Sequence, residues 1–156
     1  MIKLVYNNEK ENICVNLEYQ TSVQSSTSWD KYPFWCSDII LATDTKEDFV
    51  FVTELYVPKA HRNNGIGTRV LKDLCEEWTN QGKLIIVESG LLKSEYPEEP
   101  TDKQFNEVLD RLDKFFINRN FVNINKITNT YEYHELYVYD SEIGRKLISD
   151  LKEVYS

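Results

Sequence analysis

Cysteine, histidine and long apolar runs are scarce in this sequence of 156 residues. The three cysteines, Cys14, Cys36 and Cys75, lie far apart without CxxC spacing, so they indicate neither a disulfide framework nor a zinc site. The two histidines, His61 and His134, are distant from each other and lack a carboxylate-rich ligand pattern. We therefore expect reduced, structural cysteines and no bound metal.

Positive charge is also in deficit, with 18 Lys and Arg against 26 Asp and Glu and a formal net charge of -8. A nucleic-acid-binding surface is basic, so this balance argues against nucleic acid as a partner and is compatible with a cationic substrate. No apolar run approaches the roughly 20 residues that span a bilayer. Residues 1–8 are too short and too soon polar for a signal peptide. We expect a cytoplasmic protein without a membrane partner.

The length of the whole chain suits a single domain over residues 1–156, and a domain of this size buries about two-thirds of its unfolded surface.

The first third of the chain is rich in β-prone stretches. Residues 2–6 and 13–19 predict a hairpin, and residues 38–43 and 49–57 predict two further strands joined by a charged turn. A Ser/Thr-rich segment with an aromatic end lies between these two pairs.

The remainder predicts alternating helices and strands. A helical apolar pattern follows Gly65, and Thr101 with Gln104 forms a plausible capping box for a second helix. A strand, crossover helix and strand imply parallel pairing of the two strands. The expected elements are helix 65–79, strand 84–87, a helix with Phe105, Val108, Leu109, Leu112, Phe115 and Phe116 on its inner face, strands 121–127 and 131–139, and helix 141–154.

Two of the five glycines lie where the strand at 49–57 gives way to a helix. A dinucleotide-binding turn would need a third glycine where this chain has Val70, and a GxxxxGK[ST] loop would need a lysine where Thr68 stands. Both of these interpretations fail. A third pattern, R/Q-x-x-G-x-G/A after a strand ending like Leu-Tyr-Val-x-Pro, matches residues 62–67 without a gap.

This segment resembles the acetyl-CoA signature of the GNAT superfamily of N-acetyltransferases. Glycines without Cβ let the backbone approach a diphosphate, and helix N-terminal amides converge on it. Arg62 adds a cation and Thr68 a hydroxyl. The alternative is an ordinary turn in which Asn63 or Asn64 caps the helix.

The order of elements from residue 38 to 139 also looks like the GNAT core. Residues 115–121 are similar to the family's F-Y-x-x-x-G-F segment, with Asn120 in place of the glycine. The resemblance implies an α/β fold: a mixed sheet of about seven strands flanked by helices, here with an extra C-terminal helix. The helix pair that usually walls the substrate pocket has no clear counterpart, and the aromatic loop at 29–35 is a candidate replacement. Phe116 stands where many members carry a proton-donating tyrosine.

The resemblance further implies how the site would work. The pantetheine arm of acetyl-CoA would run beside strand 49–57, and a backbone N–H near Leu55 or Tyr56 would stabilise the oxyanion. Glu54 is our candidate base for an amine acceptor, with Tyr56 on the same strand face. The alternative is that Glu54 faces solvent or pairs with a lysine. The proton donor stays open among Tyr96, Tyr133 and water.

The expected function is transfer of an acetyl group from acetyl-CoA to a primary amine of a small molecule, peptide or protein. The rival is a GNAT-like module that binds acyl-CoA or a protein partner without turnover. The oligomeric state stays open, with a homodimer as one option. Glu54 and Tyr56 are the expected catalytic residues. The residues that the resemblance assigns to acetyl-CoA are Leu55, Tyr56, Val57, Arg62, Asn63, Asn64, Gly65, Ile66, Gly67 and Thr68.

Overall fold

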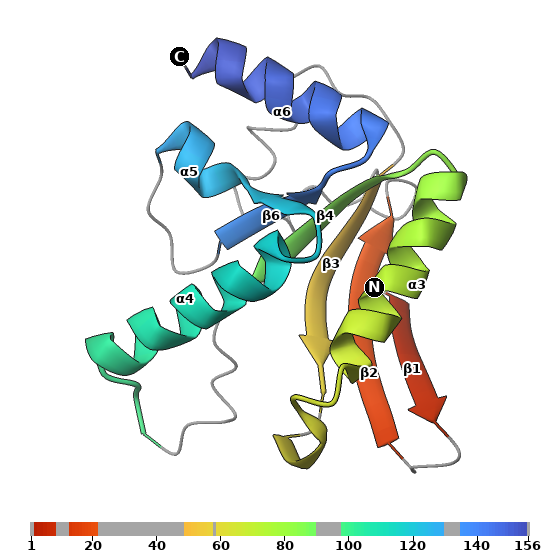
Figure 1. Ribbon diagram of the computed structural model, residues 1–156, viewed down its shortest axis with the longest axis vertical. Coiled ribbons are helices and arrows are strands. Elements are labelled where there is room, and N and C mark those ends of the chain that lie inside the picture. The colour runs from red at the N-terminus through yellow and green to blue at the C-terminus, as the bar shows by residue number, and fades with distance from the viewer. Residues whose placement is uncertain are drawn as a thin grey trace.

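The computed structural model describes residues 2–8, 13–21, 49–57, 59–89, 98–129 and 135–155. They form an α/β fold in which one mixed sheet is flanked by helices (Figure 1). The sheet has six strands in the order β1-β2-β3-β4-β6-β5. Their bounds are β1 Ile2–Asn8, β2 Ile13–Thr21, β3 Phe49–Tyr56, β4 Leu84–Ser89, β5 Phe121–Asn123 and β6 Glu135–Tyr139. The expected seventh strand, at 38–43, and the aromatic loop at 29–35 lie outside the described residues.

The helices are η2 Lys59–His61, α3 Ile66–Asn80, α4 Asp102–Ile117, α5 Ile124–Thr128 and α6 Glu142–Val154. The predictions of α3, α4 and α6 are confirmed. The capping box of α4 is present as expected, and Ser141 caps α6 by accepting a hydrogen bond from the Gly144 amide. None of these described helices combines the length and apolar composition that a membrane span requires.

Strand pairing confirms the predicted hairpin and the predicted crossover. β1 and β2 are antiparallel, and β3 and β4 are parallel with α3 between them in sequence. The antiparallel partner of β3 in the described sheet is β2, whereas the sequence suggested residues 38–43.

A bulge interrupts β3 in its pairing with β2. Glu54 faces Glu18 and Val52 faces Tyr19, so β3 carries one extra residue, Thr53, at this point. A bulge bends its strand and increases the local twist. The parallel pairing of β3 with β4 ends at Val52, directly before the bulge.

Each face of the sheet covers a separate part of the core. On one face, the side chains of Phe49 and Phe51 pack with α5 and α6. On the other, Val50 and Val52 pack with α3 and α4. β4 is buried on both faces, which explains its unbroken apolar run from residue 84 to 87.

The predicted strand at 121–127 is wrong in its second half. β5 ends at Asn123, whose side-chain oxygen accepts from the Lys126 amide and caps the short helix α5. Asn129 then ends α5 in the left-handed conformation, with φ 54°. Apolar residues in this stretch resemble a strand in the sequence, but the cap starts a helical turn. Of the predicted strand 131–139, residues 131–134 lie outside the described part of the chain.

Candidate functional site

The parallel pairing between β3 and β4 stops before either strand ends. The last pair is Val52 with Val87, yet β3 continues to Tyr56 and β4 to Ser89 (Figure 1). Beyond this point β4 pairs only with β6 on its far side, within the described sheet. Backbone groups of successive strand residues point to opposite edges, so alternate residues after the bulge present N–H and C=O toward the gap.

The N-terminus of α3 follows closely after this stretch of β3. The first main-chain bond of the helix runs from the Arg69 amide to the Gly65 carbonyl, at 3.0 Å. The amides of Gly65, Ile66, Gly67 and Thr68 donate to no backbone carbonyl of the described residues, as expected for a helix start. No side chain caps them, and the first turn holds no acidic residue. These donors and the positive end of the helix dipole suit an anion.

The two glycines of the signature have different surroundings. Gly65 is left-handed, with φ 74°, and a Cβ placed there would meet nothing within 4 Å. A Cβ on Gly67 would lie 3.4 Å from the Val57 side chain and 3.9 Å from the Phe115 ring. Gly65 therefore gives open access, whereas a side chain at Gly67 would make ordinary van der Waals contacts with Val57, just after β3, and with Phe115 of α4. The prediction that both glycines provide ligand access is supported by their surroundings only at Gly65.

Arg62 links the loop between β3 and α3 to the end of β3 through a hydrogen bond. Its Nε–H donates to the Val57 carbonyl at 2.9 Å, and its guanidinium carbon lies 5.5 Å from the centre of the Tyr56 ring. The Val57 carbonyl, which the resemblance assigned to acetyl-CoA, thus already accepts a bond from within the chain. Asn63 is left-handed, with φ 67°, and both Asn63 and Asn64 are exposed. Neither caps α3 with its side chain, which disfavours the ordinary-turn alternative.

Arg119 is a residue of this region that the sequence reasoning missed. Its Nε–H donates to Thr68 Oγ1 at 2.7 Å, and its Nη1 donates to the Phe115 carbonyl at 2.8 Å. The guanidinium carbon lies 3.8 Å from the centre of the Phe115 ring. Burial lowers the pKa of Arg119, but a guanidinium stays charged in proteins. Arg119 therefore brings a cation to the first turn of α3, and Thr68 keeps its own hydroxyl proton for donation.

Glu54 and Tyr56 share one face of β3, as strand alternation predicts. The bulge shifts that alternation by one residue. The shift is seen in Leu55 and Val57, which follow the bulge and pack against α3. Glu54 and Tyr56 therefore lie on the opposite face, and both are half-buried. Among residues whose side chains the structure describes, no lysine or arginine forms an ion pair with Glu54, so nothing there favours the lysine alternative.

Phe116, which the resemblance aligns with a tyrosine of many GNAT members, is a buried ring. Phe116 is 4% exposed and stacks on Tyr137, with 4.7 Å between ring centres. The Tyr137 hydroxyl lies 2.9 Å from both Asp113 Oδ1 and Glu135 Oε2 and donates to this pair of carboxylates. Burial raises the pKa of Tyr137, and the two carboxylates raise it further. Tyr137 therefore keeps its proton at neutral pH.

Ser89, at the end of β4, was not singled out from the sequence. Its side chain shares the α3/α4 face with Val87, two positions earlier, and its cross-strand neighbour is Glu135. The residue is 4% exposed, and within the described part of the chain its hydroxyl has no hydrogen-bond partner. A buried unsatisfied polar group costs about 1–3 kcal/mol. Only the spatial neighbourhood reveals this, since serine in a strand gives no distinctive sequence signal.

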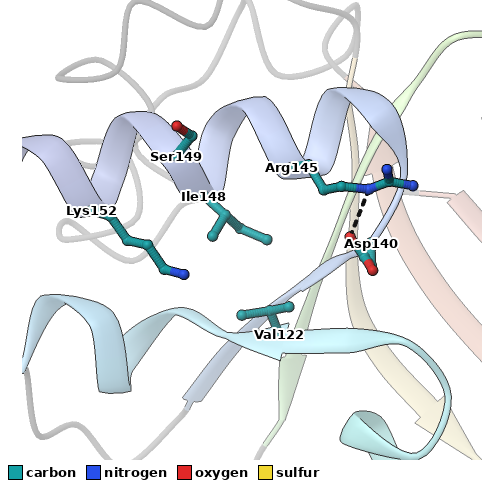
Figure 2. Close-up of a pocket in the computed structure, with 6 residues that line it drawn as sticks. All are labelled: Val122, Asp140, Arg145, Ile148, Ser149 and Lys152. Atoms are coloured by element: carbon teal, nitrogen blue, oxygen red, sulfur yellow. Dashed lines mark hydrogen bonds and ion pairs between the residues drawn. The ribbon is translucent and has the colours of Figure 1, made fainter.

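A cavity of about 380 Å³ lies on the other side of the sheet, between α6 and β5 (Figure 2). Asp140 and Arg145 at one end form an ion pair of 3.0 Å. No residue assigned above to acetyl-CoA or to catalysis lines it. The lining residues are Val122, Asp140, Arg145, Ile148, Ser149 and Lys152.

Two further expectations concern chemistry elsewhere in the chain. Cys75 is buried as predicted, and its free thiol has its pKa raised to about 12 by burial. Within the described residues, no group of three or more His, Cys, Asp or Glu side chains is placed to hold a metal ion. The candidate proton donors Tyr96 and Tyr133 lie outside the described residues. Comparison with family models, curated proteins and solved structures gave no match to this chain.

Proposed function

We propose that this protein is an acetyl-CoA-dependent N-acetyltransferase with a GNAT-like fold, acting on a primary amine. The observation that carries the proposal is the opening between β3 and β4, located just before an uncapped, glycine-containing helix N-terminus. The edge of β3 at the opening offers main-chain hydrogen bonds to an extended chain, and the N-terminus of α3 offers converging amides to a diphosphate. Acetyl-CoA has both an extended pantetheine arm and a diphosphate.

The residues present fit such a substrate. The amides from Gly65 to Thr68, with open space at Gly65, would bind the diphosphate, and Arg119 would add positive charge. The edge of β3 after the bulge would pair with the pantetheine arm. The acetyl thioester would then lie in the opening, where an N–H of Leu55 or Tyr56 would stabilise the oxyanion.

Glu54 would act as the base in this arrangement. An amine with a lysine-like pKa of about 10.4 is mostly protonated at neutral pH and must lose a proton before it attacks. The half-buried Glu54 carboxylate would accept that proton, directly or through water. A chain with net charge -8 also favours a cationic acceptor.

Calorimetric titration of the protein with acetyl-CoA tests the proposal first, and absence of binding would refute it. Thiol release from acetyl-CoA over a panel of small amines and peptides then tests turnover. Glu54→Gln should preserve binding and lower the rate mainly below the pKa of the amine. Unchanged kinetics of that variant across pH would remove Glu54 as the base.

A second candidate function is binding of acyl-CoA without turnover. The observation that favours it is Phe116, which fills the tyrosine position with a ring that has no proton to give. Failure of the amine panel alone would not establish this function, because the acceptor can be one particular protein. Binding without thiol release, in a cell extract that supplies protein acceptors as well, would favour it.

A further inference from the structure

Ser89 carries a buried hydroxyl that has no hydrogen-bond partner among the residues that the structure describes. It is the last residue of β4, two positions beyond Val87, the last residue paired with β3. It therefore borders the opening in which the proposed function places the thioester. Other buried hydroxyls nearby are engaged, since Tyr137 donates to two carboxylates.

The register of the two strands relates Ser89 to the proposed base. Val52 and Val87 are partners, and Glu54 and Ser89 each lie two residues beyond them. Because Thr53 is the extra residue of the bulge, Glu54 lies one pairing step beyond Val52, whereas Ser89 lies two residues beyond Val87, so the two residues flank the opening one step apart. Their side chains lie on opposite faces of the sheet, because Ser89 shares the face of Val87, while Glu54 lies away from α3.

We propose that Ser89 donates its Oγ–H to the sulfur of the acyl thioester and stabilises the departing thiolate. The inference rests on the proposed function. It assigns to Ser89 the donor role toward the leaving sulfur that Phe116, which has no hydroxyl, cannot fill. As the C–N bond forms, the C–S bond breaks and its electron pair passes to sulfur. The ammonium first gives one proton to Glu54, which passes it to water, and the second proton of the nitrogen goes to Glu54 as the amide forms. Ser89 keeps its own proton throughout.

Serine suits this role as a hydrogen-bond donor rather than an acid. The leaving thiol has a reference pKa of about 8.5, so the thiolate departs as an anion and takes its proton from water afterwards. The opposite faces of Glu54 and Ser89 separate the entering amine from the leaving sulfur. No other described side chain on this end of β4 offers an unengaged buried hydroxyl.

The test compares CoA with desulfo-CoA, which lacks only the sulfur. About one pH unit above the thiol pKa of about 8.5, the wild-type protein should bind CoA at least roughly tenfold more tightly than desulfo-CoA. Ser89→Ala should abolish that preference while leaving the affinity for desulfo-CoA unchanged. The pKa of the bound CoA thiol, followed by thiolate absorbance against a desulfo-CoA blank, should rise in the variant.

Ser141→Ala is the matched control, because Ser141 is a buried serine whose hydroxyl accepts from the Gly144 amide. It should lower the thermal midpoint and leave the preference for CoA intact. Ser89→Ala should leave the thermal midpoint unchanged or raise it, since no bond is lost. A preference for CoA that survives in Ser89→Ala, or that is missing in the wild type, overturns the inference alone. Failure of the wild type to bind either compound overturns the proposed function with it.

Discussion

The first turns of α3 and α4 solve the same physical problem in opposite ways. The two helices have similar lengths, 15 and 16 residues, and each begins with amides that lack intrahelical acceptors. In α4, Thr101 accepts from the Gln104 amide at 3.2 Å, Gln104 accepts from the Thr101 amide at 3.0 Å, and Asp102 adds negative charge. In α3, Gly65 offers no side chain and no acid follows.

Side chains cap the N-termini of α4 and α6, whereas no side chain caps the N-terminus of α3. α6 is also capped, by Ser141, and carries Glu142 in its first turn. A cap contributes about 1 kcal/mol, and a first-turn acid adds a few tenths more. The uncapped turn of α3 is the one beside the opening between β3 and β4. An external anion is the partner that would explain why its amide donors have no acceptor among the described residues.

The largest expected effect comes from placing a carboxylate on the α3 turn. Gly65→Asp should lower the affinity for acetyl-CoA about 100-fold or more, a change of about 2.7 kcal/mol, because the new charge opposes the diphosphate. Isothermal titration calorimetry measures the change. Aspartate tolerates the left-handed region better than most residues, and the space around Gly65 is open.

Gly82→Asp is the control for that experiment. Gly82 follows the other end of α3, has φ 73° and is equally open, so backbone strain is matched. Gly82→Asp should lose at least as much stability as Gly65→Asp, because a carboxylate is unfavourable at the C-terminal end of the helix dipole and favourable at its N-terminal end, yet only Gly65→Asp should lose affinity. Equal loss of affinity in both would show that the effect is structural and that the two ends of α3 do not differ in ligand binding.

A first-turn acid that leaves the glycines intact should separate stability from binding. Thr68→Asp should raise the free energy of unfolding by about 0.3–1 kcal/mol through the helix dipole and the nearby Arg119. The same charge should weaken acetyl-CoA binding by roughly tenfold. Thermal denaturation and calorimetry on one preparation measure both. If stability and affinity rise together, the first turn of α3 does not bind an anion.

The reverse change on α4 should affect stability alone. Thr101→Ala removes the reciprocal bonds with Gln104 and should lower the free energy of unfolding by about 1 kcal/mol, measured by urea denaturation. Acetyl-CoA affinity should stay unchanged, because α4 meets the proposed site through its C-terminal end. A loss of affinity would place the α4 N-terminus in the site and erase the contrast with α3.

Local signals in the sequence predicted much of this comparison. The capping box of α4, the start of α6 at Ser141 and the end of α3 close to residue 79 each depend on a few neighbouring residues, so pattern alone locates them. The parallel pair followed from a strand, a helix and a strand in succession. Asn120, which the sequence analysis aligned with a glycine, has φ 66° and so lies in the left-handed region that asparagine enters more easily than most residues.

Features that depend on distant pairing could not be found in this way. The bulge at Thr53 exists only in the register between β2 and β3. The bond from Arg119 to Thr68 joins residues 51 positions apart. The hydroxyl of Ser89 is unsatisfied because none of its described neighbours forms a hydrogen bond with it. The end of pairing at Val52, on which the candidate site depends, is set by tertiary geometry and not by any residue type.

The smallest expected effect tests whether the polar groups at the other end of α4 are also satisfied within the protein. Burial raises the pKa of the Asp113 carboxyl, but hydrogen bonds from Asn123, Lys126 and Tyr137 outweigh it and hold that pKa below its ordinary value. The stabilisation from Asp113 is therefore present above a pH of about 3.9 and is lost as pH falls through the folded pKa. The hydrogen bond with Asp113 raises the pKa of Lys126.

Asp113→Asn should lower the free energy of unfolding at neutral pH by less than about 1 kcal/mol, since the Lys126 side chain is 63% exposed. Urea denaturation at a series of pH values should show this deficit shrinking below a pH of about 4, where the wild type loses the same charge. Glu107→Gln, an exposed change on α4, should show no such trend. Acetyl-CoA affinity should not change. A deficit that persists at low pH would mean that Asp113 acts by packing, and a loss of affinity would mean that α4, like α3, keeps polar groups for a ligand.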